Sequence, residues 1–307
     1  MIDGDLLASF LAFGDCRNLT HAARTVGVSQ PALFERLRRL AELVGEPLYV
    51  RHGRELVLTD AGTCVLAFAR EETARHERLL AELRGSAAAA VMRREVVLAA
   101  GEGAYLYLLG PALDEAARRD DLVVQPLTLG ARDAIAALRA GRAHLGVAVV
   151  DLVPRGIVAE PLLVTPLCLC VPARHRAARA RTLTLADLRG ERWVLPPEGQ
   201  LHRDLVSRAI ARTGDAPAGV IEADGWPLML AFVARGLGVA VVNGTCVPPP
   251  GAVLRPLPEL GTVTYQLLAR RGAELPPEAH ELASVIRRTA SRSSARGPGA
   301  RRASARA

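Results

Sequence analysis

The chain has 307 residues, long enough for two or three domains, and half of them are apolar, which suffices for a large core. No run of eighteen apolar residues occurs, so no membrane-spanning helix is expected. The N-terminus begins with acidic residues and lacks the basic region of a signal peptide. The five cysteines are scattered without a CxxC pair, which is typical of reduced thiols, and we therefore expect a cytoplasmic protein.

The formal net charge of +7 is concentrated at the C-terminus. Residues 287–307 hold seven arginines and no acidic residue, whereas residues 1–69 hold seven arginines against eight acidic residues. The net charge therefore gives no support for nucleic-acid binding by the N-terminal region. Residues 291–307, rich in Ser, Ala, Gly and Arg, are expected to be disordered. They form either a solvated extension or an arm that contacts DNA without sequence preference.

Two short helices are predicted at the N-terminus. The first covers about residues 3–13 and is expected to end at Gly14. The second covers residues 19–26, with Asn18 as its N-cap. Gly27 supplies the turn that follows.

A third helix begins after Ser29, a good N-cap, with Pro31 in its first turn, where a missing N–H does no harm. A buried stripe on one side and mixed polar residues on the other are also found in ordinary surface helices. The apolar stripe, at positions i, i+4, i+7 and i+11, consists of Leu33, Leu37, Leu40 and Val44.

A hairpin and a long helix follow the third helix. A strand over residues 47–50, a basic tip at residues 51–54 and a return strand at residues 55–58 are predicted, and Thr59 then caps a helix over residues 61–83. This order is typical of a winged helix-turn-helix joined to a long connecting helix. The interrupted apolar side of the long helix consists of Ala61, Val65, Phe68, Leu79, Leu80 and Leu83.

The chain resembles the LysR-type transcriptional regulators, and the resemblance continues across nearly its whole length. The segments that carry it are residues 18–23, 28–33, 37–40, 45–51 and 58–62. The resemblance implies that the third helix enters the DNA major groove, that the wing arginine approaches the backbone or minor groove, and that the long helices pair between subunits. The residues predicted to contact DNA are Asn18, Thr20, Ser29, Gln30, Pro31, Ala32, Phe34, Glu35, Arg36, Arg38, Arg39, Arg51 and Arg54.

Phe34 and Glu35 depart from the family pattern, which commonly has a small polar residue followed by a basic one. We infer a shifted DNA specificity, since a carboxylate accepts from cytosine N4 and an aromatic ring contacts the thymine methyl. The alternative is that Glu35 only pairs with Arg38 or Arg39 at helical spacing.

From residue 94 onward strands and helices alternate, which predicts a parallel sheet covered on both faces. Strands are expected at residues 95–100, 122–129, 145–150, 166–171, 193–195 and 219–221 and after residue 236, and helices at residues 104–118, 132–140, 201–212 and 226–235. Two α/β lobes form a clamshell, and residues 262–289 return to the first lobe. The resemblance implies the same architecture, a periplasmic-binding-protein-like effector domain.

Ligands of such sheets bind at the carboxyl ends of strands, beside helix N-termini. Glu102 and Asp224 are candidates for a cationic group and Arg203 for a carboxylate, and an amino-acid-like or other polar effector would satisfy both. If they do not bind ligand, such residues cap helices or pair across the lobe boundary. The predicted effector-binding residues are Gly101, Glu102, Gly103, Ala104, Thr128, Leu129, Gly130, Gln200, His202, Arg203, Asp224, Trp226 and Asn243.

Other chemistries are disfavoured. A GxGxxG-like start at Gly101 has Leu106 at its third glycine position and lacks a following ribose-binding acid, and no catalytic triad, cofactor motif or metal site is found. Cys168 and Cys170 are more consistent with buried packing than with metal binding.

The predicted fold is an α+β multidomain chain, and no enzymatic activity, cofactor or metal is expected. Residues 1–60 form the winged helix-turn-helix, 61–90 a linker helix and hinge for dimerisation, and 91–290 a two-lobed effector domain, with lobe 1 about 91–161 and 262–290 and lobe 2 about 162–261. The predicted function is sequence-specific transcriptional regulation controlled by a small molecule; the alternative is a solute-binding module without DNA function. The expected partners are double-stranded DNA, the effector, a further copy of the chain in a homodimer or homotetramer, and RNA polymerase, with no membrane partner.

Overall fold

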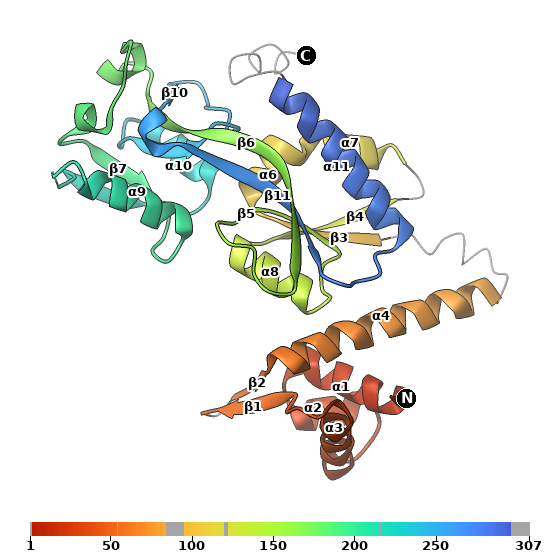
Figure 1. The fold of residues 1–307 in the computed structure, drawn as a ribbon. Helices are drawn as coiled ribbons and strands as arrows, with labels where there is room; N and C mark the ends of the chain where they lie inside the picture. The colour runs from red at the N-terminus through yellow and green to blue at the C-terminus, as the bar shows by residue number, and fades with distance from the viewer. Residues whose placement is uncertain (1, 54, 84–94, 120–121, 215, 296–307) are drawn as a thin grey trace.

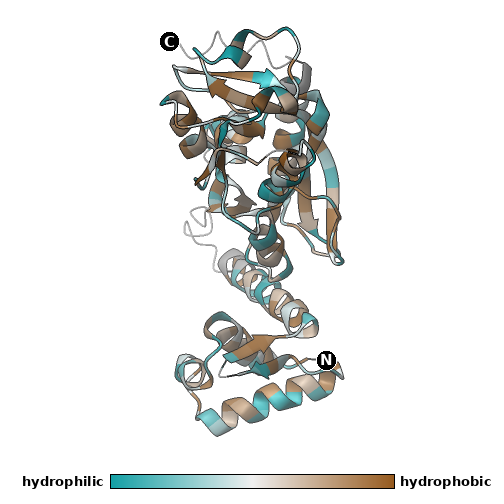
Figure 2. Cartoon of the chain, turned by 90° about the vertical axis from the view of Figure 1, so that its left-hand side faces the viewer, coloured by the Kyte–Doolittle hydropathy of each residue, from teal (hydrophilic) through white to brown (hydrophobic). Residues whose placement is uncertain are grey.

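The computed structural model describes residues 2–53, 55–83, 95–119, 122–214 and 216–295. The molecule is elongated, with the N-terminal domain at one end and the larger α/β domain at the other (Figures 1 and 2). Within the described residues, no helix combines the length and the apolar character needed to cross a bilayer. The N-terminal elements are α1 (Gly4–Cys16), α2 (Leu19–Thr25), α3 (Gln30–Val44), β1 (Tyr49–His52), β2 (Glu55–Leu58) and α4 (Asp60–Leu83).

Side-chain caps begin the helices of the N-terminal domain where the sequence predicted them. Asn18 Oδ1 accepts from the amide of His21 at 3.0 Å, and Ser29 Oγ accepts from the amide of Ala32 at 3.3 Å. Thr59 Oγ1 accepts from the amide of Gly62 at 3.0 Å. The predicted leucine stripe of α3 is confirmed as core, because its buried members are Leu33, Leu37 and Leu40.

The predicted end of α1 at Gly14 is wrong. The helix continues to Cys16 and ends where Arg17 adopts a left-handed conformation with φ 51°. Gly14 is buried instead against α4, and a Cβ added there would lie 2.6 Å from a methyl carbon of Leu66. This glycine therefore permits the close packing of two helices and does not terminate one.

Two lobes make up the α/β domain, and their strands are largely hydrophobic (Figure 2). Lobe 1 contains β3 (Glu95–Ala100), α6 (Glu102–Ala104), a π-helical turn (Tyr105–Leu109), α7 (Gly110–Ala117), β4 (Val123–Thr128), α8 (Ala131–Arg139), β5 (Leu145–Val149) and α11 (Pro277–Ala295). Lobe 2 contains short 3-10 helices (Arg176–Arg179, Leu185–Leu188 and Pro258–Leu260), β7 (Arg192–Leu195), α9 (Leu201–Ala211), β8 (Gly219–Glu222), α10 (Trp226–Ala234), β9 (Ala240–Asn243) and β10 (Ala252–Pro256).

Two strands run between the lobes, β6 (Ile157–Pro172) and β11 (Thr262–Arg270), as Figure 1 shows. The prediction of a parallel sheet is wrong for these two strands, because β11 pairs antiparallel with both β5 and β6. The prediction holds for β3, which pairs in parallel with β4 and β5. The strand predicted at residue 166 begins at Ile157. After lobe 2, β11 pairs with β5, and α11 packs on the core that includes β3 and β5.

Helix α11 covers part of the predicted tail. It extends to Ala295, so the prediction of disorder is wrong for residues 291–295, and residues 296–307 lie outside the described residues. Arg287 Nε lies 2.8 Å from Glu160 Oε1, and Arg288 pairs with Glu115. Three of the seven C-terminal arginines, Arg287, Arg288 and Arg292, therefore lie within α11.

Candidate DNA-binding surface and effector site

The N-terminal half of α3 presents an exposed surface at one end of the molecule. Gln30, Pro31, Ala32 and Glu35 are exposed on it, and the side chain of Phe34 is 49% exposed. Phe34 is therefore a large apolar side chain that lies outside the core of the domain. Thr20 Oγ1 donates to Gln30 Oε1 at 3.2 Å, which joins the start of α3 to α2.

The three arginines of α3 have different surroundings. Arg38 is held between two carboxylates, with its Nε 2.9 Å from Glu35 Oε2 and its Nη1 paired with Glu42. The hydrogen bond from Arg38 lowers the pKa of Glu35. Arg36 is directed toward α1, where its Nη2 lies 3.3 Å from Asp5 Oδ2 and its Nη1 donates to Ser9 Oγ at 3.2 Å. Arg39 is exposed.

The predicted pairing of Glu35 with Arg38 is thereby seen. At the same time Arg36, predicted as a DNA contact, connects α3 to α1 in this structure. Asn18 and Ser29, also on that list, use their side chains as helix caps. At the wing, Arg51 is exposed and its Nε donates to the carbonyl of Gly53 at 3.0 Å, while Arg54 lies outside the described residues.

The predicted effector site lies where β3 and β4 end side by side. Ala100 pairs with Thr128, and the amide of Leu129 donates to the carbonyl of Ala100 at 2.9 Å. The helix after β3 begins at Glu102 and not at residue 104 as predicted, because Gly101 takes the N-cap position. Glu102 and Gly103 therefore belong to the first helical turn.

Lobe 2 meets this turn through the start of α10. A Cβ added to Gly103 would lie 1.9 Å from Cδ1 of Trp226, so the indole ring packs directly on the glycine. The carboxylate of Glu102 lies against Gly225, with Oε2 2.4 Å from where a Cβ would stand. Gly225 has φ 85°, a conformation that favours glycine. The two lobes therefore touch at the residues that the sequence predicted as their shared ligand site.

His202 supports Trp226 from α9. The two rings are perpendicular, with centroids 4.6 Å apart. His202 Nε2 lies 2.8 Å from the carbonyl oxygen of Val241, and burial lowers the pKa of the imidazole to about 4. Since a carbonyl only accepts, the neutral ring carries its proton on Nε2.

Four other predicted residues are already engaged within the protein. Gln200 Nε2 donates to Asp224 Oδ1 at 3.0 Å, and Arg203 Nη1 donates to the carbonyl of Pro196 at 2.7 Å. Asn243 is buried, and its Nδ2 donates to the hydroxyl of Tyr265 at 2.7 Å. Because Tyr265 is on β11, Asn243 links β9 to a strand that connects the lobes, which is a structural contact that the sequence did not predict.

One residue at the lobe boundary was missed. Tyr107, in the π-helical turn of lobe 1, packs against the lobe 2 core that contains Trp226 and Met229. Burial raises the pKa of Tyr107 to about 12. Its position beyond Ala104 in a predicted regular helix gave no reason to select it, since a π-turn changes which side chains share a face.

Another cavity lies on lobe 2, away from the predicted site. A cavity of about 380 Å³ on lobe 2 is lined by residues that include Leu185, Arg189 and Arg212, and it shares no residue with the predicted site. Among the described residues, no group of three or more His, Cys, Asp or Glu is placed to hold a metal ion.

Comparison with known proteins identifies the family. Residues 89–291 match the family model described as the LysR substrate binding domain, and residues 5–63 match that of the bacterial regulatory helix-turn-helix protein, lysR family. The chain belongs to the LysR family of transcriptional regulators. The helix-turn-helix match gives no support to the alternative of a solute-binding module without DNA function.

Curated relatives of this LysR-type regulator extend over most of its length. The small neutral protease regulatory protein of Streptomyces coelicolor is 32% identical over 258 residues, which are 82% of this chain and 81% of the relative. The HTH-type transcriptional regulator BbuR of Bordetella bronchiseptica is 27% identical and covers 88% of this chain and 84% of the relative. Both relatives are named as regulators and not as enzymes.

The fold of this LysR-type regulator is also found in solved structures. The crystal structure of ArgP from Mycobacterium tuberculosis superposes with a TM-score of 0.71 and 17% identity, over 95% of this chain and 98% of that one. At this identity the likeness concerns the fold, a helix-turn-helix domain followed by a two-lobed effector domain.

Proposed function

We propose that this regulator contacts specific DNA through the N-terminal half of α3 and the β1–β2 wing, and that a small polar molecule bound between the lobes controls it. The exposed Phe34, Arg39 and Arg51 support the DNA surface. The observation that carries the effector site is the contact of Trp226 with Gly103, because it brings the starts of α6 and α10 together. A molecule at this boundary touches both lobes and therefore favours one relative arrangement of them.

The charges at the boundary favour an amine-bearing effector. Glu102 and Asp224 are exposed carboxylates, whereas the guanidinium of Arg203 is engaged by the carbonyl of Pro196. A cationic group would be attracted to the two acids, and helix N-termini would accommodate a carboxylate of an amino acid. This proposal refines the prediction that Arg203 binds the carboxylate.

A thermal-shift series on the full chain tests the effector site. Putrescine, lysine and succinate are the probes, because they present amines only, amines with a carboxylate, and carboxylates only. Lysine or putrescine should raise the melting temperature, since a ligand of the native state stabilises it. The variant Glu102→Gln should reduce the shift, whereas the exposed control His21→Gln should retain it. A shift with succinate alone, or one that Glu102→Gln leaves unchanged, would contradict the charge assignment.

Selection from a random pool of DNA duplexes tests the DNA surface. The full chain should enrich one half-site sequence, and Arg39→Ala should weaken binding to it. Failure of the wild-type chain to enrich any sequence would contradict the DNA-binding function. RNA polymerase is a further expected partner, and a footprint that adjoins the promoter in the presence of polymerase would test it.

Self-association is proposed through the free side of α4. Phe68, Leu79 and Leu83 are 41%, 52% and 73% exposed, which is unusual for large apolar side chains on one helix. Pairing of two such helices would place two DNA-binding domains at a fixed separation. Sedimentation of Leu79→Glu should show monomers where the wild type forms dimers or tetramers. Residues 84–90 of the proposed linker and hinge lie outside the described residues, and the predicted domain division remains a proposal.

A further inference from the structure

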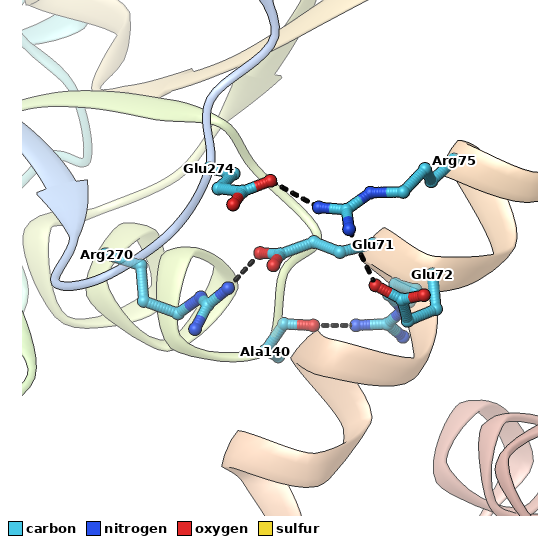
Figure 3. Close-up of polar contacts among 7 residues, drawn as sticks. Glu71, Glu72, Arg75, Ala140, Arg270 and Glu274 are labelled. Atoms are coloured by element: carbon cyan, nitrogen blue, oxygen red, sulfur yellow. Dashed lines mark hydrogen bonds and ion pairs between the residues drawn. The ribbon is translucent and has the colours of Figure 1, made fainter. Parts of the chain in front are cut away.

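Helix α4 rests on lobe 1 of its own chain through a group of polar contacts (Figure 3). Glu71 pairs with Arg270 at the end of β11, and Arg75 pairs with Glu274. In the same region, a Cβ added to Gly141 would lie 3.1 Å from Cα of Ala67, so the helix and the turn after α8 approach closely. The DNA-binding domain is therefore held by lobe 1 as well as by the covalent connection.

Arg70 of α4 contacts both domains. Its Nη1 donates to the carbonyl of Ala140, the C-cap of α8, and its Nη2 pairs with Asp15 of α1. The end of a helix carries partial negative charge, so a guanidinium is favourably placed there. The Arg70 side chain is 19% exposed, and its position between the domains is therefore largely shielded from water.

The neighbours of Arg70 connect it to both functional surfaces. Helix α8 is nine residues long and begins directly after Gly130, at the predicted effector edge, so it spans about 13 Å from that edge to Arg70. On the other side, α1 carries Asp15 near its end and Asp5 near its start, and Asp5 pairs with Arg36 of α3. Rigid helices thus join the effector edge to Arg70, and Arg70 to the DNA-contacting helix.

The sides of α4 are divided among its neighbours. Leu66 faces α1 and the core of the DNA-binding domain, while Ala67, Arg70 and Glu71 face lobe 1. Phe68 and Leu79 are exposed. Arg75, which pairs with Glu274 of lobe 1, lies on the same face of the helix as these two residues, at i+7 from Phe68 and i−4 from Leu79.

We propose that Arg70 is a positioning residue that couples the effector edge of lobe 1 to the DNA-binding domain, through Ala140 on one side and Asp15 on the other. The inference rests on the proposed effector site at the start of α8. Coupling between two sites is reciprocal, so DNA binding must alter the effector edge if the effector edge alters DNA binding. This reciprocity allows a test that requires no effector.

Amide hydrogen exchange of the full chain, free and bound to its selected DNA duplex, measures the coupling. In the wild type, DNA binding should change exchange in residues 128–135 at least about twofold. The variant Arg70→Ala should lose more than half of this change. Asp15→Asn, at an exposed carboxylate that is 54% accessible, should do the same while leaving the Arg70–Ala140 contact in place, and it remains informative if Arg70→Ala folds poorly.

Arg75→Ala is the matched control, because Arg75 is on the same helix, pairs with Glu274 and Glu72, and is 54% exposed. It should retain the wild-type change. A full change in Arg70→Ala and Asp15→Asn, an equal loss in Arg75→Ala, or no change in wild-type protein bound to its duplex would each overturn the proposal. If the wild type bound no specific DNA, the proposed regulatory function itself would be contradicted. The selection from random DNA duplexes detects that failure independently of the exchange measurement.

Discussion

The indole ring of Trp226 lies where any side chain at position 103 would have to stand, since an added Cβ would be 1.9 Å from its Cδ1 atom. At this contact, lobe 1 contributes Gly103, which has no side chain, and lobe 2 contributes Trp226, which has the largest side chain. The contact joins the two lobes at their boundary. An effector that binds there must either use the face of the indole or displace it.

Gly103→Ala should force the lobes apart or the indole out of place, at a cost of about 1–3 kcal/mol in the free energy of unfolding. Urea denaturation, with tryptophan emission as a second signal, measures this. Gly101→Ala is the matched control, because the nearest atom to its added Cβ is 3.9 Å away and its φ of −70° suits alanine. Equal destabilisation by the two variants would contradict the close contact.

The free energy of unfolding should decrease as the pH is lowered, because His202 becomes protonated. Its pKa is about 4 in the folded protein and near 6.5 when unfolded, so the unfolded state binds more protons between these values. The contribution of the neutral imidazole to stability is therefore fully present above pH 6.5. Up to about 3 kcal/mol of the free energy of unfolding is lost as the pH falls to 4. Urea midpoints measured from pH 4 to 7 should show a weaker slope in His202→Gln than in the control His21→Gln. Parallel slopes would refute this assignment.

Glu35→Gln separates the two hypotheses for this residue. If Glu35 mainly neutralises Arg38, its removal should free the guanidinium for phosphate and steepen the logarithmic salt dependence of DNA binding by up to about one unit, with unchanged sequence preference. If Glu35 recognises cytosine, the preferred half-site should change at one position. Glu46→Gln, an exposed acid beyond the end of α3, is the control. Identical salt dependence and preference in wild type and variant would exclude both roles.

Thiol reagents should distinguish the buried cysteines from Cys64. Burial raises the pKa of Cys168 to about 11 and of Cys170 to about 12, whereas Cys64 is exposed on α4. Since the thiolate is the reactive form, the buried pair should react about a hundredfold or more slowly at pH 8. Mass spectrometry after brief iodoacetamide treatment measures this, with urea-unfolded protein as the control. Rapid native labelling of Cys168 would contradict the packing role.

Local chemistry explains why much of the N-terminal domain was predictable. A cap such as Asn18 or Ser29 depends on a side chain and an amide a few residues away, and both are readable from sequence. The role of Gly14 was misjudged because its neighbour, Leu66, is distant in sequence. The first half of β6 was missed for a similar reason, since its partner strand β11 begins at Thr262.

The sequence indicated which residues meet at the lobe boundary, but not the contacts that several of them make. The rule that ligands bind at strand ends selected Gly103 and Trp226, which the fold brings together. The same rule could not foresee that Arg203 is engaged by Pro196 or that Asn243 bonds to Tyr265, because these contacts depend on the path of loops and crossing strands. Tyr107 was hidden by a π-helical turn, which has no simple sequence signal.

The course of α11 determines how the C-terminus should be shortened in practice. A deletion from Arg287 onward would remove the ion pairs to Glu160 and Glu115 and the last turns of a helix that packs on lobe 1. A deletion after Ala295 leaves these intact and removes four arginines, which lowers the formal net charge from +7 to +3. Comparison of the full chain with the shorter form at low salt would then separate attraction of DNA by the end of the chain from recognition by α3.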